Sequence, residues 1–552
     1  MKRTAIYLCM AWALAAAGCL HNDIPYPVVE CRIESIEAEG LSGAAVIDAA
    51  AGTVTLPLLE TTDIRNVRIT RAAITDKAQA SHEIEGTHDL SNPLHVVLSL
   101  YADYPWTISA EQNIPRQFAV EGQVGVTEWD FALRTATAYV GYEGSGDMPE
   151  YGPSKVRVQS LKLGPAGITR MNVPAEGIDD FEERDPEQEW NFSSYRNVNI
   201  EFHGREEQWT LYVRYTDTKV VLRRVDGWTR TAWFYGEGLS GTTLGFRYRR
   251  ADEEAWTEVP SSDITVDGGS FTAQIHGLEP ETDYEAVAWS GSDDSAVTAF
   301  RTEAEMPLPN GDFENWSQQG NVICPYLGPS DKFWDSGNWG ATTLGPEYNI
   351  TTNVTNDLHS GTSGRTAARM ASRWVVMKFA AGNIFTGEYF KTEGTHGRVN
   401  FGRRFTLHPA ALRGWAKFDN GKINRGELPK GVTAEYDEGQ IYIALGTWKA
   451  ADFGGSDESP VQVYSKDEKT FFDKNKPEVV AYGEKIYRQP TDGWEPFEIP
   501  ITWKSSDAVP THIIIVCSAS RWGDYFVGCD SNVMLVDDFE LLWDGKVEIG
   551  KW

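Results

Sequence analysis

The sequence predicts an all-β protein with several domains, in which smaller β-sandwiches precede one larger β domain. Three observations favour this class. The chain has 552 residues, which is more than one hydrophobic core usually holds. Its 51 glycines and 26 prolines are typical of many short strands joined by turns. Apolar and polar residues alternate in many short runs, whereas no amphipathic helical pattern exceeds a few turns.

The N-terminal segment has the pattern of a lipoprotein signal peptide. Residues 5–17 form an apolar run that follows two basic residues and is too short to span a bilayer comfortably. The run leads into Ala-Ala-Gly-Cys at residues 16–19, which resembles a lipobox with alanine where leucine is usual. The resemblance implies that residues 1–18 are removed, that Cys19 is lipidated, and that residues 19–27 form a tether. An ordinary secretory signal with an incidental cysteine is the alternative.

The net negative charge of the chain argues against some classes of binding partner. The formal net charge is −30, and loss of Lys2 and Arg3 with the signal peptide gives −30 − 2 = −32. Such an acidic surface repels phosphate backbones, so we expect no nucleic-acid partner. No other apolar stretch approaches membrane-spanning length. We therefore expect a monomer that contacts the membrane only through its lipid anchor.

Four cysteines remain beyond the signal and the anchor: Cys31, Cys324, Cys517 and Cys529. An oxidising periplasm would permit a disulfide, and Cys517 with Cys529 is the pair closest in sequence. Buried free thiols on neighbouring strands are the alternative. No pair has the spacing of a zinc knuckle.

Residues 28–113 and 114–218 each predict an immunoglobulin-like sandwich. Runs such as residues 95–100 alternate apolar and polar side chains, as half-buried strands do. The second segment echoes the first, because Val-Arg-Val at residues 156–158 follows the pattern of Val-Arg-Ile at residues 67–69. The echo favours two related domains.

Residues 219–304 carry a sharper pattern. Trp233 lies on an early predicted strand, and Gly-Leu-Glu-Pro-Glu-Thr-Asp-Tyr at residues 277–284 leads into the final strands. The segment resembles a fibronectin type III domain, in which this corner packs an aromatic ring over the sandwich edge. The resemblance implies a spacer or an adhesive module and no chemistry of its own.

Residues 305–552 form the larger domain and hold 11 of the 20 tryptophans, which makes this part the first place to look for ligand binding. It opens with Asn-Gly-Asp-Phe-Glu-Asn-Trp at residues 310–316 and closes with Val-Asp-Asp-Phe-Glu-Leu-Leu-Trp at residues 536–543. His-Ser-Gly-Thr-Ser-Gly-Arg-Thr lies between them at residues 359–366. The three motifs resemble the galactose-binding-like jelly rolls of carbohydrate-binding modules. That resemblance implies a β jelly roll whose first and last strands are adjacent.

A fuller resemblance is to the putative carbohydrate-metabolism domain family, lipoproteins in which immunoglobulin-like domains precede such a jelly roll. Four motifs carry it, at residues 379–388, 407–415, 441–445 and 518–528. They are spread over most of the domain. The resemblance implies a function in carbohydrate binding or metabolism.

A cation site is the first candidate in this domain. The candidate ligands are Asp312, Glu314 and Asp538, with Asp537 and Glu540 beside them. Their oxygens suit a hard ion, and similar modules hold a structural calcium there. Strict alternation would place Asp537 on the opposite face from Asp538. We expect no required cofactor, and calcium as the structural ion. Solvated edge carboxylates are the alternative.

A sugar-binding surface is the second candidate. Pyranose rings stack on aromatic planes, while carboxylates and guanidinium groups hydrogen-bond to hydroxyls. Aromatic residues in predicted loops are therefore preferred over those on strand-like runs, which fill the core. The candidate ligand-binding residues are Trp334, Trp339, Trp448, Arg521, Trp522 and Asp524.

A hydrolytic pair is the third candidate. Glycosidases use two carboxylates about 5 to 9.5 Å apart, one of them with a raised pKa. Glu388 and Asp524 lie in two family-like motifs and are the candidate catalytic residues. The sequence contains no nucleophile elbow, zinc-binding helix, phosphate loop or dinucleotide fingerprint.

The sequence therefore favours a lipid-anchored, non-catalytic protein that binds a polysaccharide or oligosaccharide through its jelly roll. We expect an outer membrane lipoprotein, at the cell surface or on the periplasmic face, with the three sandwiches holding the jelly roll away from the membrane. A glycoside hydrolase that works through Glu388 and Asp524 is one alternative. A structural or adhesive envelope protein is the other.

Overall fold

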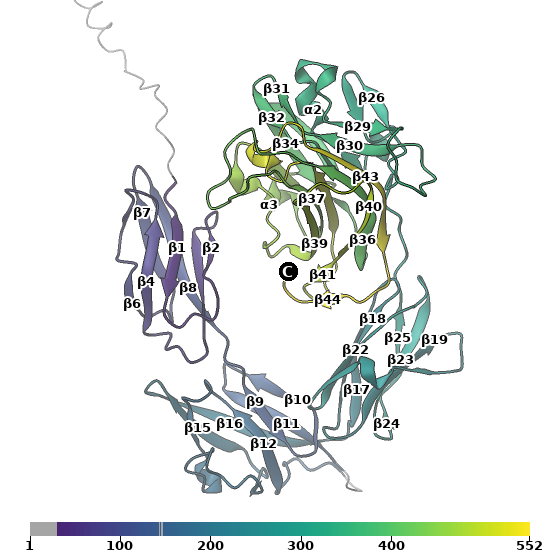
Figure 1. Ribbon diagram of the computed structural model, residues 1–552. Helices are drawn as coiled ribbons and strands as arrows, with labels where there is room; N and C mark the ends of the chain where they lie inside the picture. Colours follow the sequence, from purple (N-terminus) through teal and green to yellow (C-terminus); the bar gives the residue numbers. More distant parts are fainter. Residues whose placement is uncertain (1–29, 143, 145–146) are drawn as a thin grey trace, which may run out of the picture.

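The computed structural model describes residues 30–142, 144 and 147–552, so the predicted signal peptide, the predicted lipidation site Cys19 and the predicted tether lie outside the described residues. The described chain is nearly all β, which confirms the predicted fold class. It runs through three sandwiches into the jelly roll, and the four parts are arranged around a ring (Figure 1). No helix in this part of the chain is long and apolar enough to cross a membrane.

The first sandwich has its core between two sheets. Its strands are β1 (Ile33–Ala38), β2 (Val46–Asp48), β3 (Thr53–Leu58), β4 (Val67–Ile74), β5 (Gln79–Ala80), β6 (Gly86–His88), β7 (Leu94–Ser99) and β8 (Asp103–Gln112). One sheet has the order β1-β4-β6 and the other the order β2-β3-β8-β7-β5. Alternate residues of β8, Trp106 and Ile108, point into the core. The Trp106 indole donates a hydrogen bond of 3.1 Å to the carbonyl of Cys31 and so ties β8 to the start of the domain.

The second sandwich repeats this two-sheet plan. Its elements are β9 (Gln117–Val120), β10 (Gln123–Asp130), β11 (Thr135–Gly141), β12 (Val156–Lys162), β13 (Arg170–Asn172), η1 (Pro174–Glu176), β14 (Glu189–Trp190), β15 (Arg196–Phe202) and β16 (Arg205–Thr216). The sheets have the orders β10-β11-β16-β15-β13 and β14-β12-β9. Trp190 and Trp209 are buried in the core between them.

The third sandwich contains the corner that the sequence pattern indicates. Its elements are β17 (Val220–Gly227), β18 (Ala232–Gly238), β19 (Leu244–Arg250), β20 (Thr257–Glu258), η2 (Ser261–Asp263), β21 (Ile264–Asp267), β22 (Ser270–Ile275), β23 (Asp283–Ser290), β24 (Asp293–Asp294) and β25 (Thr298–Arg301). The sheets are β17-β18-β22-β21 and β20-β19-β23-β24, with β25 paired to β23. The buried Tyr284 hydroxyl accepts a hydrogen bond of 3.0 Å from the backbone N–H of Glu279. This contact fixes the corner that leads into β23.

The jelly roll has two main sheets with two small hairpins at their edges. Its first elements are β26 (Ser317–Gln319), β27 (Val322–Cys324), η3 (Pro329–Asp331), β28 (Trp334–Asp335), α2 (Asn338–Ala341), η4 (Thr342–Leu344), η5 (Pro346–Tyr348), β29 (Thr351–Val354), β30 (Ala367–Ala371), β31 (Arg373–Val375), β32 (Lys378–Ala380), β33 (Asn383–Glu393), β34 (His396–Phe401) and β35 (Arg403–Arg404). The remainder are β36 (Ala411–Asp419), β37 (Gly439–Gly446), α3 (Ala450–Phe453), β38 (Val461–Tyr464), η6 (Glu468–Thr470), β39 (Val479–Tyr487), β40 (Glu495–Pro500), β41 (Thr502–Trp503), β42 (His512–Ser518), η7 (Gly523–Tyr525), β43 (Val533–Leu542) and β44 (Glu548–Ile549). The large sheet has the order β38-β34-β33-β42-β37-β39-β41-β44, and the smaller sheet has the order β29-β30-β43-β36-β40.

The core of the jelly roll lies between these sheets. Ile441, Ile443 and Ile515 from the large sheet and Met534 and Val536 from the smaller one are fully buried in it. The opening segment runs beside the last long strand, because the N–H of residue 539 donates a hydrogen bond of 2.8 Å to the carbonyl of residue 311. The two ends of the domain are therefore adjacent, as the resemblance to jelly rolls implies.

The third sandwich is joined to the jelly roll by a buried tryptophan. The Trp228 ring stacks on His408 at 4.8 Å and contacts Trp503 at 5.1 Å, so its side chain belongs to the jelly-roll core. Tyr235 of the same sandwich makes a hydrogen bond of 2.5 Å with Ser506. Because a side chain of one domain completes the core of the next, this junction is fixed by packing.

The ring closes where the first sandwich meets the jelly roll (Figure 1). Three ion pairs join them: Glu34 with Lys430 at 2.7 Å, Glu30 with Lys469 at 2.9 Å, and Asp48 with Lys476 at 3.1 Å. The three sandwiches therefore do not form an extended stalk between the start of the described chain and the jelly roll. The chain bends at its domain junctions and brings both ends of the array together.

The four described cysteines, Cys31, Cys324, Cys517 and Cys529, are buried free thiols. The structure thus favours the free-thiol alternative over a bond between Cys517 and Cys529. Cys517 packs in the jelly-roll core, and complete burial raises the pKa of its thiol.

Candidate functional site

A cavity of about 390 Å³ lies against one face of the large sheet. Alternate residues of the central strands explain its position: Phe385 and Tyr389 of β33, Tyr442 of β37 and Val516 of β42 point into it. The residues between them point the other way into the core. A sheet that is apolar on both faces needs a second covering layer, and here loops provide it. The uncovered space between sheet and loops is the cavity.

Three loop regions and the segment from α2 to η4 close the cavity. The β31–β32 hairpin contributes Met377 and Lys378, the β33–β34 turn contributes His396, and the η7 turn contributes Asp524 and Phe526. Apolar and aromatic side chains make up most of the lining, and polar side chains such as Asn383, Gln440 and Asp524 lie among them, a mixture that is typical of small-ligand sites. Its size is within the range of such sites.

Asp524 is the only carboxylate among the described residues that line the cavity. Asp524 is an exposed residue at the wall of the cavity. Desolvation by the surrounding protein atoms raises the pKa of the Asp524 carboxyl to about 6. Among the described residues, no cation and no hydrogen-bond donor stabilises the Asp524 carboxylate. Asp524 is thus free to accept hydrogen bonds from a ligand.

Lys378 is held at the cavity wall by two uncharged groups. Its Nζ lies 3.5 Å from the centre of the Phe526 ring and 3.3 Å from Nε2 of His396. Burial lowers the pKa of Lys378, and no charged side chain offsets this effect among the described residues. The pKa of His396 is also lowered, first by burial and then by Lys378, so the neutral ring accepts from the ammonium.

Arg521 also lines the cavity but is already paired. Its Nη1 donates to Glu438 at 2.7 Å, and its backbone N–H donates to the carbonyl of Glu438 at 2.7 Å. Glu438 also pairs with Arg488 at 3.2 Å. Arg521 therefore reaches the cavity as a guanidinium that already has a carboxylate partner, and its remaining N–H groups can donate to a ligand.

The structure places the tryptophans predicted to bind sugar in packed positions. Trp334 is fully buried, and its indole donates to the carbonyl of Pro309 at 2.8 Å. Trp448 and Trp522 are only 3% and 7% exposed, and Trp339 packs against a small cluster around Cys324. None of the four lines the cavity. They cannot stack on a ligand there, because loops of this large domain pack on one another and need aromatic residues for their own core.

The two candidate catalytic carboxylates do not share the cavity. Glu388 follows Gly387 on β33 and does not line the cavity, whereas its neighbour Tyr389 does. The Glu388 carboxylate accepts hydrogen bonds from Asn400 at 3.2 Å and Ser456 at 3.4 Å. Strand alternation therefore directs Glu388 and Asp524 to different surroundings.

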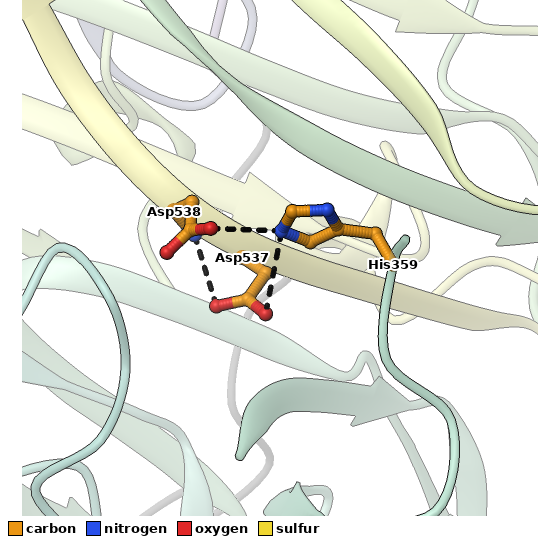
Figure 2. A group of neighbouring side chains, drawn as sticks. All are labelled: His359, Asp537 and Asp538. Carbon is orange, nitrogen blue, oxygen red and sulfur yellow. Dashed lines mark hydrogen bonds and ion pairs between the residues drawn. The ribbon is translucent and has the colours of Figure 1, made fainter. Parts of the chain in front are cut away.

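A second polar site lies on the smaller sheet, where His359, Asp537 and Asp538 meet (Figure 2). The Nε2 atom of His359 is 2.8 Å from Asp538 Oδ2 and 3.9 Å from Asp537 Oδ2. The His359 ring stacks on Trp415 at 4.4 Å, which fixes its orientation. Burial, followed by repulsion from Asp538, raises the pKa of the Asp537 carboxyl to about 7.

A β-bulge explains why both aspartates reach His359. The pairing of β36 with β43 shifts between Arg413 and Trp415, so an extra residue of β43 is inserted at this point. Asp538 has φ +48°, a left-handed conformation that is uncommon outside glycine. The prediction that Asp537 faces away from Asp538 is wrong, because it assumed an unbroken strand.

The other carboxylates of the predicted cation site have different roles. Asp312 is exposed and outside the cluster. Glu314 accepts backbone hydrogen bonds from Arg365 at 2.6 Å and Thr366 at 2.8 Å. The cluster does fit a divalent cation, because Asp537 Oδ2 is buried without a hydrogen-bond partner and points toward His359 (Figure 2). His359, Asp537 and Asp538 would hold such an ion.

Comparison with known proteins agrees with the motifs of the C-terminal domain. Residues 312–542 match the family model described as "Putative carbohydrate metabolism domain". This match lies within the jelly roll. The matched segment follows the three β-sandwiches and contains both the cavity and the His359 cluster.

Several solved structures are similar to the chain. One is titled as a putative glycoside hydrolase from Bacteroides thetaiotaomicron; it is 14% identical, with 95% of this chain and 99% of that chain covered and a TM-score of 0.30. Another is titled as a putative glycoside hydrolase from Bacteroides vulgatus. It is 22% identical, with 42% of this chain and 96% of that chain covered and a TM-score of 0.32. A third is titled as a carbohydrate-binding module specific for non-crystalline cellulose. It is 9% identical, with 42% of this chain and 97% of that chain covered and a TM-score of 0.18. The search of curated proteins finds no match.

Proposed function

We propose that this protein binds a glycan in the cavity of its carbohydrate metabolism domain and does not cleave it. The observation that carries the proposal is the lining of the cavity. Tyr389 and Phe526 offer aromatic surface for the apolar face of a pyranose, and Asp524, Arg521 and Gln440 offer polar groups for its hydroxyls. A cavity of about 390 Å³ accommodates one or two sugar rings at a time.

The position of the carboxylates favours binding over hydrolysis. The usual glycosidase mechanisms use a pair of carboxylates on either side of the scissile bond. Asp524 has the raised pKa of a general acid, but Glu388 does not line the cavity. The hydrolase alternative through this pair therefore lacks its second group.

A glycan array with sugar release assayed in the same wells tests the proposal on the full chain without its signal peptide. We expect binding without release, weakened at least tenfold in an Asp524→Asn variant. Trp339→Ala is the matched control, because this ring is in the same domain and outside the cavity. Release of reducing sugar by the wild-type protein would favour the hydrolase. Absence of any binding would favour the structural or adhesive alternative.

We also propose that Cys19 carries a lipid and holds the protein at the outer membrane, at the cell surface or on the periplasmic face. The lipobox-like residues 16–19 support this proposal. Metabolic labelling with a radioactive fatty acid tests it. Label in the wild-type protein but not in a Cys19→Ala variant is expected, and equal label in both would contradict lipidation at this residue.

The His359 cluster is a proposed site for a structural divalent ion. Such an ion would neutralise two adjacent carboxylates and give the unpartnered Asp537 oxygen a ligand bond. The cluster replaces the site first predicted from Asp312, Glu314 and Asp538. It does not line the cavity, so we assign the ion no role in ligand binding.

A further inference from the structure

The charged side chains that line the cavity differ in whether they have a partner of opposite charge. Arg521 has a carboxylate partner in Glu438, whereas Lys378 and Asp524 have no charged partner among the described residues. The cavity therefore presents one isolated ammonium and one isolated carboxylate to its ligand.

The isolated ammonium is the less common feature. A lysine taken partly out of water normally has an anionic partner, because burial of an unpaired charge is costly. His396 accepts one of its three N–H bonds and the Phe526 ring faces its charge, but neither group is an anion. A negatively charged group on the ligand would complete this arrangement.

Two residues beside Lys378 have left-handed backbone conformations, which supports a functional role for this part of the cavity. Phe526, the ring beneath the ammonium, has φ +58°, and Val376, two residues before Lys378, has φ +51°. Left-handed backbone is unfavourable for aromatic and β-branched residues, and such outliers cluster at functional sites. Both segments that hold the ammonium in place thus carry unfavourable backbone conformations.

We propose that the cavity binds an acidic sugar, a uronic acid residue, with its carboxylate on Lys378 and its hydroxyls on Asp524. This inference rests on the proposed glycan-binding function and names the class of ligand. A uronic acid has a carboxylate at one end of a pyranose, hydroxyls at the other, and an apolar ring face between. These features match an ammonium, a carboxylate and an aromatic lining. The whole chain carries a net charge of −30, so this selectivity is local to the cavity.

The alternative charged ligand is an amino sugar, with its ammonium on Asp524. Such a ligand would leave Lys378 without an anion and bring a second cation into the same small space. A neutral sugar would satisfy Asp524 but would likewise leave Lys378 unpaired. Of the three classes, the acidic sugar alone provides a partner for both isolated charges.

The test measures binding of matched oligosaccharides to the full chain without its signal peptide. The probes are oligomers of galacturonic, glucuronic, mannuronic and guluronic acid, each beside its neutral counterpart, and oligomers of glucosamine. Isothermal titration calorimetry on wild type and a Lys378→Met variant gives the affinities. Lys391→Met is the matched control, because Lys391 is a neighbouring exposed lysine that pairs with Glu393 and does not line the cavity.

We expect at least one uronate oligomer to bind tenfold or more tightly than its neutral counterpart. In Lys378→Met this preference should disappear, whereas in Lys391→Met it should persist. A preference for neutral or amino sugars, or a uronate preference that survives Lys378→Met, would overturn the acidic-sugar inference and leave the glycan-binding function standing. Failure of every probe and of a neutral glycan array would overturn both. Thermal unfolding of each variant shows whether it is folded.

Discussion

The indole Nε1 of Trp228 donates a hydrogen bond of 2.9 Å to the carbonyl oxygen of Ser506, across the junction of the third sandwich and the jelly roll. The donor is 2% exposed and belongs to the core of the neighbouring domain. The carbonyl would lose this donor in an isolated jelly roll, and His408 and Trp503 would lose the ring that covers them. The jelly roll is therefore complete only when the third sandwich is present.

Replacement of Trp228 by alanine should destabilise the jelly roll itself. The change removes a large buried side chain, which typically lowers the free energy of unfolding by about 3 to 5 kcal/mol. Differential scanning calorimetry of the full chain should show a lower unfolding temperature for the largest domain. Trp256→Ala in the same sandwich, where the ring packs beneath Arg249, should leave that transition in place. An isolated fragment of residues 305–552 that unfolds at the wild-type temperature would refute the shared core.

Ligand affinity should depend on pH through Asp524. The raised pKa of about 6 means that the free carboxyl takes up a proton as the pH falls through 6. The protonated form loses acceptor capacity, so affinity should be highest above pH 7 and should fall about tenfold by pH 5. In Asp524→Asn the affinity should be weak and nearly constant between pH 5 and 8. An unchanged pH profile in that variant would assign the titration to another group.

Divalent ions should stabilise the protein through the His359 cluster. In the presence of EDTA, Asp537→Asn should raise the free energy of unfolding at pH 8 by roughly 1 to 3 kcal/mol, because it removes a buried carboxylate whose Oδ2 has no hydrogen-bond partner. The folded-state pKa of Asp537 is raised from its ordinary value of 3.8 to about 7, so this gain should shrink as the pH falls from 8 to 4, because the folded-state carboxyl takes up its proton over this range. Thermal unfolding with calcium, manganese and zinc tests whether a divalent ion stabilises the protein. Wild type should gain stability from at least one ion, and Asp537→Asn should not.

The ring should open when its three lysine pairs are reversed. Exposed ion pairs contribute about 0.2 to 1 kcal/mol each, so Lys430→Glu, Lys469→Glu and Lys476→Glu together should release the first sandwich from the jelly roll. Small-angle X-ray scattering should then give a larger radius of gyration. A charge-matched control with Lys391→Glu, Lys422→Glu and Lys546→Glu should keep the wild-type value. Equal radii for all three proteins would mean that other contacts close the ring.

Strand patterns and turn motifs were sufficient to predict the fold class. The corner at Tyr284 and the adjacency of residues 311 and 539 also follow from motifs, because each depends on a few residues close in sequence or on a familiar jelly-roll connection. The bulge at Asp538 does not follow, since one inserted residue cancels strict alternation and leaves no signal in composition. Contacts between domains, such as the insertion of Trp228 into the jelly-roll core, cannot be predicted from the pattern of either domain alone.

The candidate site was predicted only in part, for a physical reason. Arg521 and Asp524 line the cavity, but Trp334, Trp448 and Trp522 do not, because loops in a large domain have cores of their own. One feature of the sequence does indicate the position of the site. Residues 441–445 are apolar on both faces of a strand in a sheet whose inner face already fills a core. A strand of that kind needs a second cover, and the space beneath that cover is where the ligand site lies.

The closed ring also determines how near the cavity domain can be to a bilayer. Glu30, the first described residue, pairs with Lys469 of the jelly roll, and only 30 − 19 = 11 positions separate it from Cys19. Eleven residues extend over about 40 Å at most. If Cys19 is acylated as proposed, the jelly roll lies within one protein diameter of the lipid headgroups. A glycan would then have to be drawn down to the membrane surface to be bound.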